Sequence, residues 1–372
     1  MAYRKTLIAN DMKKVFGLFL SLIVLMGLSA CEPELPEDSK KPNPEESSYL
    51  TFVSSGESSV TLVRVGEPFD ISISLEYSLD GTNWNPYTIG ETISLLDGEK
   101  LMFRAGIVRN KSFSHSYDRY YKFKIFGSVA AKGNIMSLLN RKCSSNSVLS
   151  YTFFNLFSDC TGLTSAPDLP ATELAEFCYR RMFYGCTKLT TAPVLPAKEL
   201  AEHCYSSMFQ GCTSLNEAPE LPATVLAERC YSIMFQGCTS LNEAPELPAT
   251  VLAEYCYYDM FQNCTSLTEA PDLPATELAK SCYSLMFKNC SNLVKAPDLP
   301  ATKLAERCYF GMFKGCTNLN YVKALFTGEP SESTRDWLSG VSSTGTFVKS
   351  KEAKWDVRGE NGIPEGWTVV TE

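Results

Sequence analysis

Hydrophobic and polar positions recur with a period of 26 residues over residues 151–319. The unit is CYxxMFxGCTxLxxAPxLPATxLAxx, and residues 208–228 are identical to residues 234–254. Two cysteine series keep the same step: Cys160, Cys186, Cys212, Cys238, Cys264, Cys290 and Cys316, and Cys178, Cys204, Cys230, Cys256, Cys282 and Cys308. A period of about 20–50 residues predicts a repeat fold, in which each unit buries its apolar side by stacking on its neighbours.

Within one unit, the apolar positions predict a short helix followed by a short strand. Leu200, Ala201, Cys204 and Met208 have the i, i+1, i+4, i+8 spacing of one helical face, and Gly211 ends the pattern. The extended segment that follows must be brief, because its two prolines cannot donate backbone hydrogen bonds. We therefore predict an α+β solenoid of 26-residue coils, each with one short helix, one short strand and two turns.

The motif MFxGCTxL, with Phe, Cys and Leu at fixed offsets, resembles the BspA-like leucine-rich repeats of bacterial surface proteins. The resemblance covers roughly residues 150–320, and the unit here has APxLP where the commonest form has a β-branched run. The terminal sequence GIPEGWTVV is similar to the tail of other BspA-like lipoproteins. The resemblance implies a right-handed, leucine-rich-repeat-like stack and the role of an adhesin for host proteins or other cells.

Residues 1–31 are typical of an export signal. Two lysines precede an apolar run over residues 15–28, and small residues lead to Cys31 in a pattern that resembles the lipobox of bacterial lipoproteins. We predict that Cys31 is lipidated, and that residues 32–48, rich in proline and acids, are a disordered spacer. The protein is then expected to be lipid-anchored in the outer membrane, exposed on the cell surface, with no other membrane contact.

Residues 49–140 are predicted to form a small antiparallel β-sandwich and a cap for the repeats. β-Branched and aromatic runs separated by turn residues cover residues 51–53, 60–65, 69–77, 92–96 and 100–105. Asp80-Gly81 and Asp97-Gly98 are typical of hairpin turns. The segment around Asp80 is also similar to the Asp box of sialidase-like propellers. It is one residue short and occurs once, so an ordinary hairpin is the favoured interpretation.

The repeat region is predicted to span residues 141–320, and residues 321–372 to form a compact C-terminal cap. The 26-residue pattern stops at this boundary. A stack of repeats needs a different end unit to cover its last apolar surface. Three of the four tryptophans of the chain lie in this segment: Trp337, Trp355 and Trp367.

The composition argues against nucleic acid as a partner and offers no catalytic motif. The formal charge is −8, and no basic stripe offsets it. The chain contains no P-loop, GxSxG, GxGxxG or HExxH sequence. His203 adjoins Cys204, but the equivalent positions of other units hold Phe, Arg, Tyr or Ser, so a catalytic base is not expected there. We predict a non-enzymatic protein without a required cofactor.

The repeat cysteines have three interpretations. A zinc site is the least favoured, since no CxxC pair occurs and no histidine recurs. Disulfides suit an exported protein, and Cys143 with Cys160 plus six pairs within repeats would use every cysteine after Cys31. Eight helical residues, however, separate two Cα atoms by roughly 12 Å, beyond the ~7 Å limit for a bridge. Buried free thiols are therefore favoured.

Acidic residues recur at two positions of consecutive coils and form the candidate ligand face. Stacking is expected to bring them to neighbouring strands about 5 Å apart. Such a row is either a solvated face or a site for Ca²⁺ or a basic protein. The candidate residues are Glu217, Glu220, Glu243, Glu246, Glu269 and Asp272.

An aromatic row follows the same period. Core packing with the hydroxyl groups at the rim is favoured over a platform for stacking sugars. The row consists of Tyr179, Tyr205, Tyr231, Tyr257, Tyr283 and Tyr309.

These observations leave two functions of different classes. The first is a non-enzymatic surface lipoprotein that binds an extracellular protein through its repeats. The second is a glycan-binding component of a nutrient-uptake system, with the N-terminal sandwich as the sugar module. A hydrolase would depend only on the incomplete Asp box.

Overall fold

The computed structural model describes residues 49–67 and 70–372, which belong to one compact unit. The predicted lipidation site Cys31 and the spacer over residues 32–48 lie outside the described residues. Both therefore stay predictions.

The N-terminal part consists of two β-sheets that face each other. Phe52 and Phe103 of the first sheet meet Phe123 of the second, with ring centroids 5.1 and 5.6 Å away. Neighbouring strands are antiparallel, except for the parallel pair β9–β10. The first sheet has the order β10 (Leu163–Ser165), β9 (Val129–Lys132), β1 (Leu50–Ser54), β6 (Lys100–Ala105), β3 (Leu75–Ser78) and β4 (Asn85–Pro86). The second has the order β5 (Thr92–Leu95), β2 (Ser58–Val65), β8 (Arg119–Phe126) and β7 (Ser114–Ser116).

The two predicted hairpins have different outcomes. Asp80-Gly81 lies between β3 and β4, which pair as predicted. The hairpin predicted at Asp97-Gly98 is wrong, because β5 pairs with β2 and β6 pairs with β1 and β3. Turn chemistry at Asp97-Gly98 specifies a reversal of the chain, but it does not specify which strands will pair. The strand predicted over residues 69–77 begins only at Leu75.

The hydrophobic core runs without a break from these sheets into the repeats. β10 belongs to the first repeat and pairs with β9. Phe157 of that repeat stacks on Phe123 of β8, with centroids 5.3 Å apart, and the N–H of Phe123 donates to the carbonyl of Leu156. The sheets therefore cover the first coil.

The helix predicted in each unit is wrong. The only helices of the described residues are two short 3-10 turns, η1 (Ile135–Leu138) and η2 (Glu332–Thr334). In its place, each coil has a run of overlapping turns in which every fourth residue has a positive φ, as at His203 (55°), Ser207 (57°) and Gly211 (76°). We call this run the turn ribbon: residues 177–185, 203–211, 229–237, 255–263, 281–289 and 307–315.

Alternate backbone N–H groups of the turn ribbon bond within the coil and to the next coil. The N–H of Met208 donates to the carbonyl of Tyr205, which closes a turn, whereas the N–H of Tyr205 donates to the carbonyl of Cys230 at 3.1 Å. The left-handed residue at every fourth position gives the ribbon a repeat of four residues. Two neighbouring side chains then belong to the core cluster, such as Met208 and Phe209, and the next two, Gln210 and Gly211, do not.

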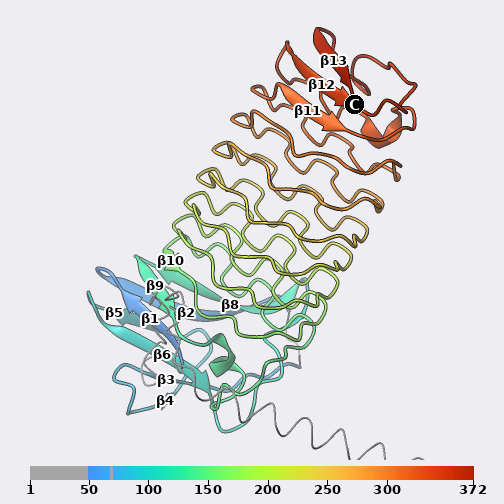
Figure 1. Cartoon of the computed structure of the whole chain (residues 1–372). Coiled ribbons are helices and arrows are strands. Elements are labelled where there is room, and N and C mark those ends of the chain that lie inside the picture. The colour runs from blue at the N-terminus through green and yellow to red at the C-terminus, as the bar shows by residue number, and fades with distance from the viewer. Residues whose placement is uncertain (1–48, 68–69) are drawn as a thin grey trace, which may run out of the picture. The chain divides into compact units, whose positions relative to one another are not determined.

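The coils stack in register, as Figure 1 shows between β10 and β11. The phenyl rings of equivalent residues from Phe157 to Phe313 lie 5.5–5.7 Å apart and almost parallel. The tyrosine row from Tyr179 to Tyr309 stacks in the same way, at 5.8–6.1 Å. These rows form the core of the repeat region.

The strand segments of the repeats are as irregular as the prolines predict. Beyond β10, the coils are joined there by single parallel bridges, such as Thr191–Glu217 and Val225–Val251. A regular ladder returns after the repeats, where β11 (Tyr321–Ala324), β12 (Gly345–Lys349) and β13 (Trp367–Thr371) form a parallel sheet. In the same segment, the buried ring of Trp337 stacks on Tyr309 at 6.2 Å and covers the end of the tyrosine row.

Candidate functional site

The six acidic candidates lie on the proline-containing edge of the repeats, and all six side chains are exposed. They occupy two positions of three consecutive coils. Glu217, Glu243 and Glu269 form one row, and Glu220, Glu246 and Asp272 form the other. We call these six residues the acidic edge.

The first acidic row interrupts the bridges between coils. Thr191 bridges Glu217 and Glu269 bridges Lys295, but among the described residues no bridge joins Glu243 to Glu217 or to Glu269. The continuous strand pairing expected of this row is therefore absent. Like charges at adjacent positions repel, which favours loose pairing at Glu243 and close pairing where a lysine follows.

Two open grooves lie along the acidic edge. The smaller has a volume of about 480 Å³ and brings together Glu220 and Glu246 with four prolines, and its lining residues are Ala218, Pro219, Glu220, Leu221, Pro222, Pro245, Glu246 and Pro248. The larger, of about 710 Å³, includes Glu269 and Asp272 beside Lys295. A groove that is lined by carboxylates and by apolar proline rings suits a ligand with basic and apolar groups.

The acidic edge has no ionic partner within the described chain. None of its six carboxylates takes part in the ion pairs that the described residues form. No group of three or more His, Cys, Asp or Glu side chains in residues 49–67 and 70–372 could hold a metal ion. A Ca²⁺ site, one of the alternatives for this row, would thus need further ligands, which the arrangement does not supply.

The tyrosine row is part of the core, which excludes a surface platform for sugars. Its six side chains are at most 1% exposed, so the hydroxyl groups do not reach the rim. Burial raises the pKa of these phenols well above its ordinary value. The hydroxyl groups of Tyr179 and Tyr283 have no hydrogen-bond partner among the described residues.

The thirteen cysteines from Cys160 to Cys316 are buried free thiols, as favoured from the sequence. In each coil, one thiol donates to a carbonyl of the preceding coil; Cys238 donates to Phe209 at 3.1 Å. Burial raises the pKa of Cys264 to about 12, so this thiol stays protonated and is a poor nucleophile.

His203 and Cys204 do not form a catalytic pair. Cys204 is fully buried, and burial raises its pKa to about 12. His203 stacks on Phe177, with centroids 4.7 Å apart. Burial, helped by Arg180 and Arg229, lowers the pKa of His203 to about 4. The imidazole is therefore neutral, and no thiolate lies beside it.

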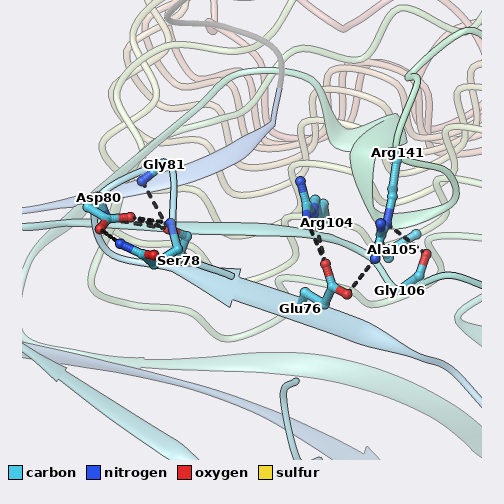
Figure 2. Close-up of polar contacts among 9 residues, drawn as sticks. Glu76, Ser78, Asp80, Gly81, Arg104, Ala105, Gly106 and Arg141 are labelled. Atoms are coloured by element: carbon cyan, nitrogen blue, oxygen red, sulfur yellow. Dashed lines mark hydrogen bonds and ion pairs between the residues drawn. The ribbon is translucent and has the colours of Figure 1, made fainter. Parts of the chain in front are cut away.

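The segment that resembles an Asp box is an ordinary hairpin. Figure 2 shows Asp80 turned toward Ser78, whose hydroxyl donates to it and also accepts from the N–H of Gly81. The backbone N–H groups of Thr82 and Asn83 donate to the Asp80 carboxylate at 2.8 Å. These bonds hold the pKa of Asp80 well below its usual range. The carboxylate therefore stabilises the turn.

Figure 2 also shows how the first sheet is tied to the start of the repeats. Glu76 of β3 accepts from Arg104 of β6 at 2.9 Å and pairs with Arg141. The Nε of Arg141 also donates to the carbonyls of Ala105 and Gly106. These contacts fix the geometry of the sheets and offer no open site.

A second surface, which the sequence analysis missed, lies on the turn ribbon. Three positions of each coil face away from the core, and their apolar members do not pack against it. We call them the turn-ribbon face: Phe177, Arg180, Arg181, His203, Ser206, Ser207, Arg229, Ser232, Ile233, Tyr255, Tyr258, Asp259, Ser281, Ser284, Leu285, Arg307, Phe310 and Gly311. The signal that could have revealed this face is the change of residue type at these positions, as between Ser207 and Ile233 in two coils that are otherwise almost identical.

Comparison with known proteins identifies the repeats. A family model described as BspA type leucine rich repeat region matches six copies, over residues 143–268 and 205–327. No curated protein and no solved structure matches the chain. Within the described residues, no helix is long and apolar enough to cross a membrane.

Proposed function

Through residues 143–327 the chain belongs to the BspA-type leucine-rich repeat family, and on this premise we propose that it is a non-enzymatic cell-surface protein that binds macromolecules. The proposed ligands are host proteins or proteins of other cells. The proposed binding element is the stack of repeats, continued as a right-handed solenoid.

The observation that carries this proposal is the register of the coils. In the turn ribbon, backbone N–H groups donate to the carbonyl of the residue 25 positions further on, in the next coil. The N–H of Ser207, for example, donates to the carbonyl of Ser232 at 2.8 Å. Side chains at equivalent positions therefore form continuous rows. Rows of this kind present an extended surface, which suits a macromolecule better than a small molecule.

The acidic edge is proposed as one contact of this surface. Its carboxylates are exposed and form no ion pair among the described residues. Glu220 and Glu246 line a groove together with four prolines. A basic segment of a protein would supply both the charge and the apolar stems of lysine or arginine. Ca²⁺ is the weaker proposal, because the described residues offer too few ligands at one point.

The chain is further proposed to be a lipoprotein of the outer membrane. This proposal depends on the lipobox-like sequence that ends at Cys31. A lipid on Cys31 would leave the repeats outside the bilayer and free to meet a ligand.

A glycan-binding role in nutrient uptake is the alternative, and one observation supports it. The rings of Tyr49 and Trp84 are partly exposed and meet with centroids 5.0 Å apart. Such a pair could stack on a sugar ring. The guanidinium of Arg104, however, lies 3.8 Å from the Trp84 centroid, so one face of the indole is already covered.

The test compares the two ligand classes on the full chain, since the sheets and the first repeat share one core. The protein is presented to an array of extracellular proteins and to a glycan array, beside a variant without residues 234–259 and beside Trp84→Ala. We expect saturable binding to a protein, weakened about tenfold or more by loss of the coil and unchanged by Trp84→Ala. Glycan binding that Trp84→Ala removes would support the alternative instead. Saturable binding to neither array would refute both.

A further inference from the structure

The turn-ribbon face holds large side chains where the backbone favours small ones. Three residues of each ribbon have a positive φ, and at the third of these positions every coil has Gly or Asn, as at Gly211 (76°) and Asn263 (62°). The first two positions have the same backbone geometry but carry residues such as Arg229 (53°) and Ile233 (63°). A left-handed conformation costs a residue with a Cβ atom about 1–2 kcal/mol. The chain therefore has these side chains although they lower the stability of the fold, which is typical of functional positions.

A comparison of two neighbouring coils locates the variation on this face. Residues 204–229 and 230–255 are identical except at two positions, where Ser207 corresponds to Ile233 and Arg229 corresponds to Tyr255. Both differences lie on the turn-ribbon face, at positive φ. The acidic edge is unchanged between the two coils although its side chains are exposed, whereas Ser207 is buried and Arg229, Ile233 and Tyr255 are half-buried. Exposure alone therefore does not account for where the differences lie.

The face is cationic and aromatic, although the chain as a whole is acidic. It carries four arginines and one carboxylate, that of Asp259. The guanidinium of Arg181 lies 4.1 Å from the ring centroid of Tyr184, and that of Arg229 lies 4.0 Å from that of Tyr255. Stacking of this kind holds a guanidinium in place. The Nε of Arg229 already donates to Glu228 at 3.4 Å, whereas Arg181 forms no ion pair among the described residues and its edge is available for a carboxylate.

Several polar side chains of this face lack a hydrogen-bond or ionic partner among the described residues. The Nε atoms of Arg180 and Arg181 and the Nδ1 of His203 are buried without a hydrogen-bond partner among the described residues. Arg180, Arg181 and Arg307 form none of the chain's described ion pairs. Buried donors are normally satisfied, so the Nε–H groups of Arg180 and Arg181 are open to an acceptor on a partner.

We propose that the turn-ribbon face is a docking surface for the acidic surface of a folded protein, with Arg180 and Arg181 as the contacts for its carboxylates. This inference rests on the proposed function and names the face and the partner chemistry. A polyanionic glycan repeats along its length and would be matched by the same residues in every coil. Here the residues change from coil to coil, as a non-repeating protein surface requires. Tyrosine, phenylalanine and arginine are also the residues enriched at the centres of protein interfaces.

The first experiment locates the contact. A photo-reactive benzoylphenylalanine replaces Tyr258 on the face, Glu246 on the acidic edge or, as the matched control outside both surfaces, the exposed Phe126 of β8 in the full chain. Each variant is irradiated in the native surface environment, and adducts are identified by mass. We expect a discrete protein adduct from position 258 and none from position 126.

The second experiment tests the chemistry with the captured protein after its purification. We expect Arg180→Glu/Arg181→Glu to weaken binding about 10- to 100-fold, because buried or partly buried charge pairs are lost. Arg180→Lys/Arg181→Lys keeps the charge but loses the planar guanidinium groups, which can bind a carboxylate with two hydrogen bonds. A smaller loss of affinity, about 3- to 10-fold, is therefore expected. Lys351→Glu/Lys354→Glu, at two exposed lysines of the C-terminal segment outside both surfaces, is the charge-matched control and is expected to leave this affinity unchanged. Circular dichroism checks that each variant is folded, and Arg181→Glu alone is the substitute if the double variant is not.

Each contrary outcome has a separate meaning. An adduct only from position 246 would overturn this inference and leave the proposed function standing on the acidic edge. A protease-resistant glycan adduct from position 258 would overturn the inference and favour the glycan alternative. Binding that is insensitive to both arginine pairs would also overturn it. If neither position 258 nor position 246 gave an adduct, the inference and the proposed function would both fail.

Discussion

The phenyl rings of Phe209 and Phe235, 26 residues apart in the chain, stack with centroids 5.7 Å apart and planes 5° from parallel. The thiol of Cys238 lies in the same layer and donates to the carbonyl of Phe209 at 3.1 Å. Aromatic rings and thiols thus fill one core together. This arrangement has a consequence for the reactivity of the cysteines.

We predict that the repeat thiols are reduced and inaccessible in the folded protein. They are buried, and burial raises the pKa of Cys212, for example, to about 12, so little thiolate is present at neutral pH. Labelling of native protein with a maleimide should be slow, and it should become fast in denaturant. A Cys143→Ser variant identifies any signal from that half-buried position. A native mass that shows six or seven disulfides would contradict the prediction.

Ile233→Asn is predicted to stabilise the protein by about 1 kcal/mol. Ile233 is β-branched and has a φ of 63°, a conformation that asparagine tolerates much better. Its side chain does not pack against the core, so little burial is lost. The midpoint of thermal unfolding by circular dichroism is the measurement. Gly237→Ala, at a φ of 75° in the same ribbon, is the matched control and should lower the midpoint. A lower midpoint for Ile233→Asn would show that the ribbon does not strain this residue.

Asp259→Asn is predicted to stabilise the protein in a pH-dependent way. Burial raises the pKa of Asp259 from 3.8 to about 6. The folded state therefore holds this proton more tightly than the unfolded state, and the contribution of Asp259 to stability is lost as the pH rises from about 4 through 6. The variant should be more stable than the parent by about 2 kcal/mol at pH 8, and the gain should vanish near pH 4.

Comparing Asp259→Asn with the parent by denaturant unfolding at each pH removes the opposite contribution of His203. The lowered pKa of His203 destabilises both proteins equally as the pH falls below about 6.5. A gain that is the same at pH 4 and pH 8 would show that the Asp259 carboxyl is not responsible for it.

Cys31→Ala is predicted to release the protein from the membrane fraction without unfolding it. A lipid on Cys31 is the only anchor that the sequence suggests, and the proline-rich spacer separates it from the folded part. The measurement is fractionation after an alkaline wash, with circular dichroism of the released protein. Retention of the variant in the membrane fraction would refute the lipoprotein proposal.

The sequence predicted the N-terminal strands better than the repeat backbone. Five of the β-runs overlap β1, β2, β3, β5 and β6, because alternating burial in a sheet has a clear period of two. The turn ribbon was mistaken for a helix, since periods of 3.6 and 4 residues cannot be separated over the ten residues from Leu200 to Phe209. The recurring glycine or asparagine, as at Gly211 and Asn263, was the available signal for left-handed turns.

The candidate site was predicted in part. The recurrence of Glu220 and Glu246 at one position of consecutive coils is visible in the sequence, whereas the groove they share depends on coil spacing that no single repeat contains. The turn-ribbon face was missed because its residues have no common type. Its residues share only a backbone conformation and a direction away from the core, and both become visible only in three dimensions.

The most direct test of the stacked-coil account compares two deletions by solubility and thermal unfolding beside the parent. Removing residues 234–259 joins Ile233 to Met260. The N–H of Ile233, which donates to the carbonyl of Tyr258 in the parent, then meets the equivalent carbonyl of Ser284. We predict a soluble protein with the parental circular dichroism and a modestly lower midpoint. Removing only residues 234–246 displaces every later Phe, Met and Cys from its row, and the cost should exceed the ~5–15 kcal/mol stability of a domain. We predict that this variant is unfolded or insoluble. Equal damage from the two deletions would contradict the stacking of the repeats and the binding surface built on it.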